Sequence, residues 1–110
     1  MTKEQFYDLQ LLGHSITKYC RAMENFRAVT ESREMLAKGM RQKYPNMKVE
    51  AIRERIWEQE EDLAKTAQVE FEEMRINAYS LGWNFDHKDV HEELSGIIRK
   101  DYPSLKDINV

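Results

Sequence analysis

Two histidines four residues apart, His87 and His91, are the clearest candidates for metal chemistry in this chain. On a helix they share one face, which is a spacing that zinc sites use. The glutamate that follows the first histidine of a metalloprotease helix is absent, because Lys88 occupies that position. Two histidines without a third ligand do not complete a zinc site. The simpler interpretation is a solvated first turn of a helix, with Asp86 as its N-cap and Asp89 facing the helix dipole.

No other group of residues predicts catalysis. Cys20 and His14 are six residues apart, on roughly opposite sides of a helix, so they cannot form a local nucleophile and base. The chain has no glycine-rich phosphate loop, serine elbow or nucleotide fingerprint, and no Glu-x-x-His pair of a di-iron bundle. We therefore expect a protein that is not an enzyme and carries no cofactor, with a metal-dependent enzyme as the least supported alternative.

A row of like charges marks the longest apolar-patterned segment. Glu50, Glu54 and Glu58 follow one another at four-residue steps, which destabilises an isolated helix by about a few tenths of a kcal/mol per pair. Such a row favours a cationic neighbour, and the stretch 18–43 carries seven Lys and Arg against three Glu. The complementary charges can pair within one bundle or between subunits. A solvated face remains the simpler interpretation, since surface charges contribute little.

Trp57 stands next to this acidic row. It directly follows Ile56 of the apolar stripe, so it lies beside the core rather than at its centre. Tryptophans in such positions often anchor protein–protein interfaces, although packing in the core or at the edge of the bundle is the simpler interpretation. We therefore treat Trp57, Glu50, Glu54 and Glu58 as the candidate partner-binding residues.

A short helix, the turn Tyr44–Met47 and a second helix together have the outline of a helix-turn-helix. Lys48, Arg53 and Arg55 would then contact DNA. The same helix continues into the acidic run 58–62, which would repel phosphate. A nucleic-acid-binding regulator is therefore the second interpretation, and nucleic acid is disfavoured as a partner.

Composition limits the class of protein. The 110 residues fit a single domain, and 41% hydrophobic with 34% charged residues is typical of a helix-rich globule. A net charge of −3 gives no general attraction for nucleic acid or anionic lipid. The single cysteine excludes an internal disulfide, and no segment is apolar enough for a membrane span or a signal peptide. We expect a cytoplasmic protein.

Apolar spacing predicts four helices and no strand. The first covers residues 2–28 with a Thr2–Gln5 capping box, and the second begins at Thr30 or Ser32 and ends at residue 43. The third runs from 49 to about 81, with Gln59 on its apolar stripe, and Gly82 ends it. The fourth runs from 87 or 88 to about 100. The apolar seam of the first helix has coiled-coil spacing: Leu9, Leu12, Ile16, Tyr19, Met23 and Phe26.

Residues 34–48 and 92–106 resemble each other, which suggests an internal repeat of 3–47 and 48–106. The proposed unit is a long helix, an Asn-Phe corner, a short helix and a Tyr-Pro stop. It predicts that Tyr44 and Tyr102 are both buried and that Leu36 and Leu94 occupy matching core positions. The paired positions are Asn25-Phe26 with Asn84-Phe85, Leu36 with Leu94, and Tyr44-Pro45 with Tyr102-Pro103.

These observations predict an all-α bundle of about four helices, two long and two short, arranged as stacked αα-hairpins. The long amphipathic helices favour packing between subunits. We therefore expect a non-enzymatic adaptor, inhibitor or regulatory protein that binds another protein and acts as a homo-oligomer, in the simplest case a homodimer.

Overall fold

The structure is a computed structural model of the chain, and it describes residues 1–85, 88–101 and 105–108. Four α-helices follow one another, α1 (Lys3–Glu31), α2 (Arg33–Lys43), α3 (Val49–Tyr79) and α4 (Val90–Asp101), and a 3₁₀ turn, η1 (Leu105–Asp107), comes last. The described residues contain no strand. The prediction of an all-α protein with two long and two short helices is confirmed.

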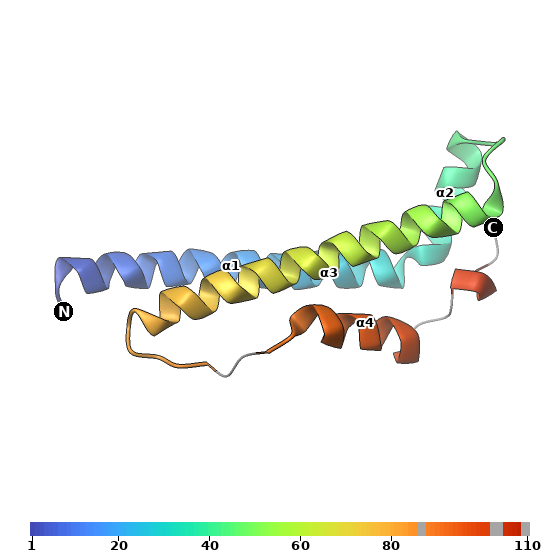
Figure 1. The fold of residues 1–110 in the computed structure, drawn as a ribbon. Helices are drawn as coiled ribbons and strands as arrows, with labels where there is room; N and C mark the ends of the chain where they lie inside the picture. Colours follow the sequence, from blue (N-terminus) through green and yellow to red (C-terminus); the bar gives the residue numbers. More distant parts are fainter. Residues whose placement is uncertain (86–87, 102–104, 109–110) are drawn as a thin grey trace.

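The two long helices form an antiparallel hairpin (Figure 1). α1 and α3 share the most extensive interface of the molecule, and α4 packs against α3 beside them. α2 turns away from the line of α1 and packs on the first turns of α3, at the end opposite the N-terminus (Figure 1). The result is an elongated molecule of 60 × 26 × 16 Å.

Local interactions explain where α1 begins and ends. The Gln5 amide donates to Thr2 Oγ1 at 3.1 Å and the Thr2 amide donates to Gln5 Oε1 at 2.9 Å, which confirms the predicted capping box. The helix breaks at Ser32, whose amide donates to the carbonyl of Val29. Ser32 is the N-cap of α2 but its side chain makes no capping bond. α1 and α2 are therefore two helices separated by a single residue.

The start of α4 differs from the predicted one. The helix begins at Val90, and Asp89 caps it by accepting from the amide of Glu92 at 2.8 Å. The predicted start at residue 87 or 88 is wrong, and the cap is Asp89 rather than Asp86. Asp86 and His87 lie outside the described residues. A second residue that caps α4 is distant in the sequence. Gln68 Oε1 on α3 accepts hydrogen bonds from the amides of Val90 and His91.

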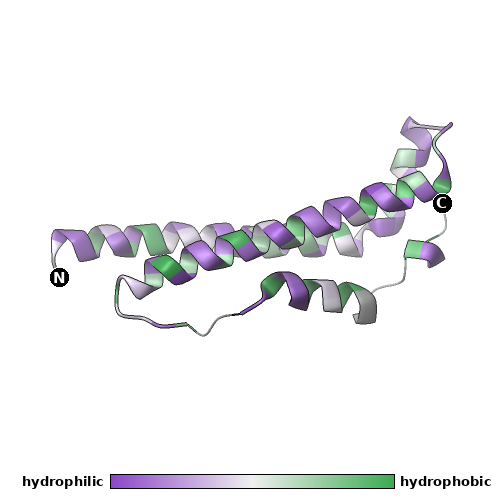
Figure 2. Cartoon of the chain, viewed as in Figure 1, coloured by the Kyte–Doolittle hydropathy of each residue, from purple (hydrophilic) through white to green (hydrophobic). Residues whose placement is uncertain are grey.

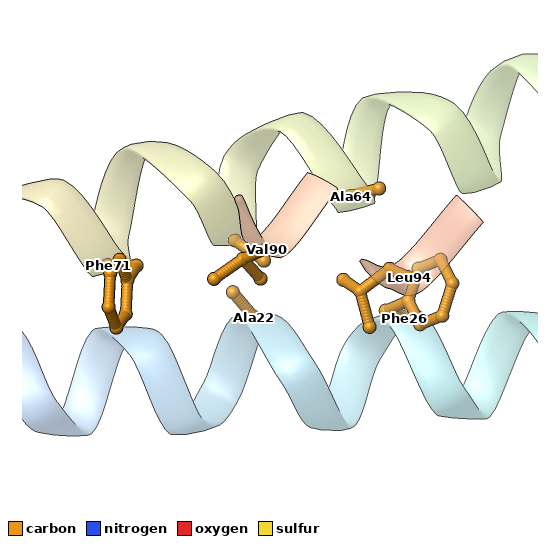
Figure 3. Close-up of a cluster of buried hydrophobic side chains, with 7 residues drawn as sticks. Ala22, Phe26, Ala64, Phe71, Val90 and Leu94 are labelled. Carbon is orange, nitrogen blue, oxygen red and sulfur yellow. The ribbon is translucent and has the colours of Figure 1, made fainter. Parts of the chain in front are cut away.

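Two apolar clusters hold the helices together. In the larger one, Val90 and Leu94 of α4 reach between α1 and α3 (Figure 3). Small side chains such as Ala22 and Ala64 allow the two long helices to approach closely there. The smaller cluster joins α2, the start of α3 and the C-terminal segment through Ala37, Ile52, Ile56 and Ile108. Polar residues cover much of both long helices elsewhere (Figure 2).

The internal repeat is only partly matched by the structure. α2 and α4 each end directly before a Tyr-Pro dipeptide, as predicted. The predicted Asn-Phe corner is wrong, because Phe26 is buried inside α1 whereas Phe85 lies in the connection before α4 and is 41% exposed. Tyr44 is 40% exposed instead of buried, and Tyr102-Pro103 lies outside the described residues. The duplication stays a prediction.

Candidate protein-binding surface

Trp57 lies between two grooves on the surface of the molecule. It projects from the first half of α3 and is 49% exposed. On one side it borders a groove of about 520 Å³ between α3 and α4, which His91, Ser95 and Ile98 also line. On the other side it borders a groove of about 460 Å³ between α3 and η1, which Leu105 also lines. Trp57 therefore separates two grooves and is accessible from both.

Carboxylates surround this tryptophan. The three predicted residues Glu50, Glu54 and Glu58 are all exposed on α3. The first two line the groove beside η1, and Glu58 lines a shallower depression along α3. Seven acidic residues share the Trp57 grooves: Glu50, Glu54, Glu58, Glu61, Asp62, Asp89 and Glu92. We call Trp57 with Glu50, Glu54 and Glu58 the acidic surface.

The acidic surface is not neutralised by the cationic first half of the chain. Only two of the seven cations between residues 18 and 43 form a described ion pair: Lys18 with Glu73 and Arg33 with Glu60. Within the part of the chain that the structure describes, no ion pair reaches Glu50, Glu54 or Glu58. Among the described residues, the cations of the first half therefore pair with other acidic residues of α3 and not with the acidic row.

The buried ion pair itself was missed by the sequence analysis. Glu60 is fully buried on α3, and Arg33 at the start of α2 is 3% exposed. Arg33 Nε and Nη2 donate to the two carboxylate oxygens of Glu60, both at 2.7 Å. Thr30 Oγ1 donates to the same carboxylate at 3.4 Å. This bidentate pair connects the α1–α2 junction to α3 and satisfies charges that would otherwise be costly to bury.

His91 has a structural contact rather than metal ligands. Its Nε2 lies against Glu61 Oε1, so the histidine connects α4 to α3. Among the described residues no group of three His, Cys, Asp or Glu side chains could hold a metal ion. Lys88, just before α4, donates a hydrogen bond to Glu93. This bond, together with the negative charge of Glu93, raises the pKa of Lys88. The described side chains at the start of α4 thus form ion pairs and caps.

The three cations of the DNA-binding alternative do not form one surface. Lys48 and Arg55 are exposed and seven residues apart, which places them on the same side of α3. Arg55 lies 5.7 Å from the centre of the Tyr44 ring. Arg53 is partly buried, and its Nη2 donates to the carbonyl of Ile108 at 3.1 Å. Arg53 therefore holds the C-terminal segment against α3.

Comparisons with known proteins give no relative: no family model, curated protein or solved structure matches this chain. Within the described part of the chain, no helix combines the length and the apolar character that crossing a bilayer requires. The geometry of the acidic surface is therefore the basis for inferring function.

Proposed function

We propose that this chain is a non-enzymatic protein-binding protein, of the adaptor, inhibitor or regulatory kind, that acts as a homo-oligomer. The acidic surface is its binding site for protein. A cytoplasmic location belongs to the same proposal, since a reducing compartment suits a chain whose one cysteine, Cys20, is an exposed thiol.

The observation that carries this proposal is the excess surface of the single chain. Its accessible area is 7866 Å². A compact monomer of 13.2 kDa exposes about 6,400 Å². The difference, about 1,450 Å², exceeds the ~800 Å² that each partner contributes to an interface of standard size. The chain thus has enough surplus area for a stable contact with another protein.

The shape of the molecule agrees with its area. The radius of gyration is 17.9 Å, against about 13 Å for a compact domain of this length. α1 extends beyond the end of α3, where α4 does not cover the hairpin (Figure 1). Several apolar side chains are at least 39% exposed along the two long helices: Phe6, Leu9, Ile16, Trp57, Val69 and Ile76. A second chain packed on these helices would cover apolar surface that water now contacts.

The acidic surface suits a protein better than a small molecule. Sites for small molecules are mostly apolar and enclose their ligand. The groove beside α4 is instead lined largely by polar side chains, among them Glu61, Asp89 and Glu92. Trp57 stands as a half-exposed ridge between this groove and the one beside η1, where Glu50 and Glu54 lie close to Arg53 and Lys106. A large aromatic side chain surrounded by polar residues is the usual composition of an interface anchor with its rim.

Fluorescence of Trp57 tests the proposal directly. In a Trp83→Phe variant, Trp57 is the only tryptophan. If the acidic surface binds a second chain, Trp57 emission should shift to shorter wavelength as the protein is concentrated from nanomolar to high micromolar, because the indole leaves water. In the matched control, Trp57→Phe with Trp83 retained, the emission should stay constant or change much less. Trp57 emission that is independent of concentration would argue against binding at this surface.

A further inference from the structure

The chain offers a candidate for the protein that occupies the acidic surface. Resting on the proposed function, we infer that a second copy of this chain binds there and contacts the acidic surface through α2. The contacting residues on α2 are Met35, Lys38 and Lys43, which we call the cationic face. The two surfaces would meet reciprocally across a two-fold axis.

Charge complementarity supports this pairing. Lys38 and Lys43 are exposed on α2, and neither forms an ion pair with the described carboxylates. Glu54 and Glu58 on α3 are equally without a described ion pair. Although α2 and α3 pack against each other, their exposed charges point into solvent within one chain. A second copy would supply the missing partner for each set, and such complementarity selects and orients the partner.

Both surfaces also carry an apolar residue for the centre of a contact. Trp57 is 49% exposed, and Met35 is 76% exposed on α2. Met35 and Lys38 border a groove of about 620 Å³ beside the α1–α2 junction, which Glu31, Glu34 and Ile108 also line. Interface cores are enriched in tryptophan and methionine and are surrounded by polar residues. Met35 therefore gives the cationic face an exposed apolar side chain that can pack against Trp57.

The position of the two surfaces permits a closed dimer. α2 packs on the first turns of α3, so the cationic face and the acidic surface lie at the same end of the molecule. A two-fold axis at that end would let each copy present both surfaces, which doubles every contact. The surplus area of about 1,450 Å² per chain exceeds the ~800 Å² that a standard interface, formed here by both reciprocal contacts together, takes from each partner.

Charge reversal followed by mixing tests this inference. One variant carries Glu54→Lys and Glu58→Lys, and the other carries Lys38→Glu and Lys43→Glu. Each variant alone should associate about tenfold more weakly or worse than the wild type, because like charges then face each other. An equimolar mixture should restore association, since both contacts are again between opposite charges. The control is Glu4→Lys with Glu24→Lys, which changes the same charge at exposed positions of α1.

Light scattering after gel filtration reads the result, and helical circular dichroism shows that each variant is folded. As a second measurement, raised salt should weaken association of the wild type, because exposed charges are screened. A monomeric wild type would refute the proposed homo-oligomer and this inference together. An oligomer that is unaffected by either charge reversal or by salt would leave the oligomer standing but refute this interface. Variants that dissociate and do not recover on mixing would refute the pairing of the two surfaces.

Discussion

Glu60 is a fully buried carboxylate at the point where α1, α2 and α3 meet. It lies in the interior of α3 with both carboxylate oxygens facing Arg33, and Thr30 donates to it as well. A buried pair of this kind contributes little net stability compared with apolar residues of the same volume, yet removing one partner is costly. Its role here is to fix the position of α3 against the junction between α1 and α2.

Replacing Glu60 with glutamine should therefore destabilise the protein strongly. The change leaves the buried Arg33 guanidinium without this carboxylate, and we expect a loss of about 3–5 kcal/mol in the free energy of unfolding. Urea denaturation followed by circular dichroism measures it. The matched control is Glu24→Gln, at an exposed position of α1 outside the acidic surface, which should change stability by about 0.5 kcal/mol or less. Equal effects of the two substitutions would show that the buried pair does not have this role.

At the scale of elements, α4 is attached to α3 by side chains that also cap its first turn. Gln68 of α3 accepts from the amides of Val90 and His91, and Glu61 contacts the His91 ring. The two bonds to Gln68 satisfy amide groups that the first turn of any helix leaves without an intrahelical partner. Val90 and Leu94 complete the attachment by filling the space between α1 and α3.

Because side chains of α3 already cap and hold the described part of α4, metal should be dispensable. We expect that a chelator leaves the melting temperature unchanged. Differential scanning calorimetry of the same sample before and after dialysis against the chelator gives the comparison. A decrease of several degrees, reversed by added zinc, would show that His87 and His91 bind a metal after all.

Some of these elements could be predicted from the sequence because their signals are local. Thr2 with Gln5 forms the predicted capping box, and Gly82 adopts a φ of 81° after the end of α3, a conformation that glycine adopts without strain. The acidic row is likewise where a four-residue period places it, on the exposed side of α3. The all-α class follows from the same periodicity, since apolar spacing is set by the helix itself.

The missed features depend on distant residues. Glu60, rather than the expected Gln59, continues the buried stripe of α3, and its partner Arg33 is twenty-seven residues away. The start of α4 depends on Gln68, which lies more than twenty residues upstream. Ile108 is 2% exposed, although a single isoleucine in a terminal segment has no periodicity that would indicate burial. Tertiary contacts decide each of these cases, and one sequence does not reveal them.

At the scale of the whole molecule, the proposed homo-oligomer rests on the elongated shape of the chain. It is 60 Å long and 16 Å across its shortest dimension, and α4 covers only part of the long hairpin. The acidic surface and the cationic face have complementary charges and lie at one end of this elongated shape. The self-association that we propose would account for the excess area, the exposed apolar side chains and the exposed charges without a described ion pair.

The molar mass in solution tests this account most directly. Sedimentation equilibrium across the micromolar range, with a reducing agent because Cys20 is exposed, separates true association from disulfide cross-linking. A homo-oligomer should have a mass of twice 13.2 kDa, or a larger multiple, and this mass should decrease only when the sample is diluted. A mass of 13.2 kDa at every concentration in that range would contradict it.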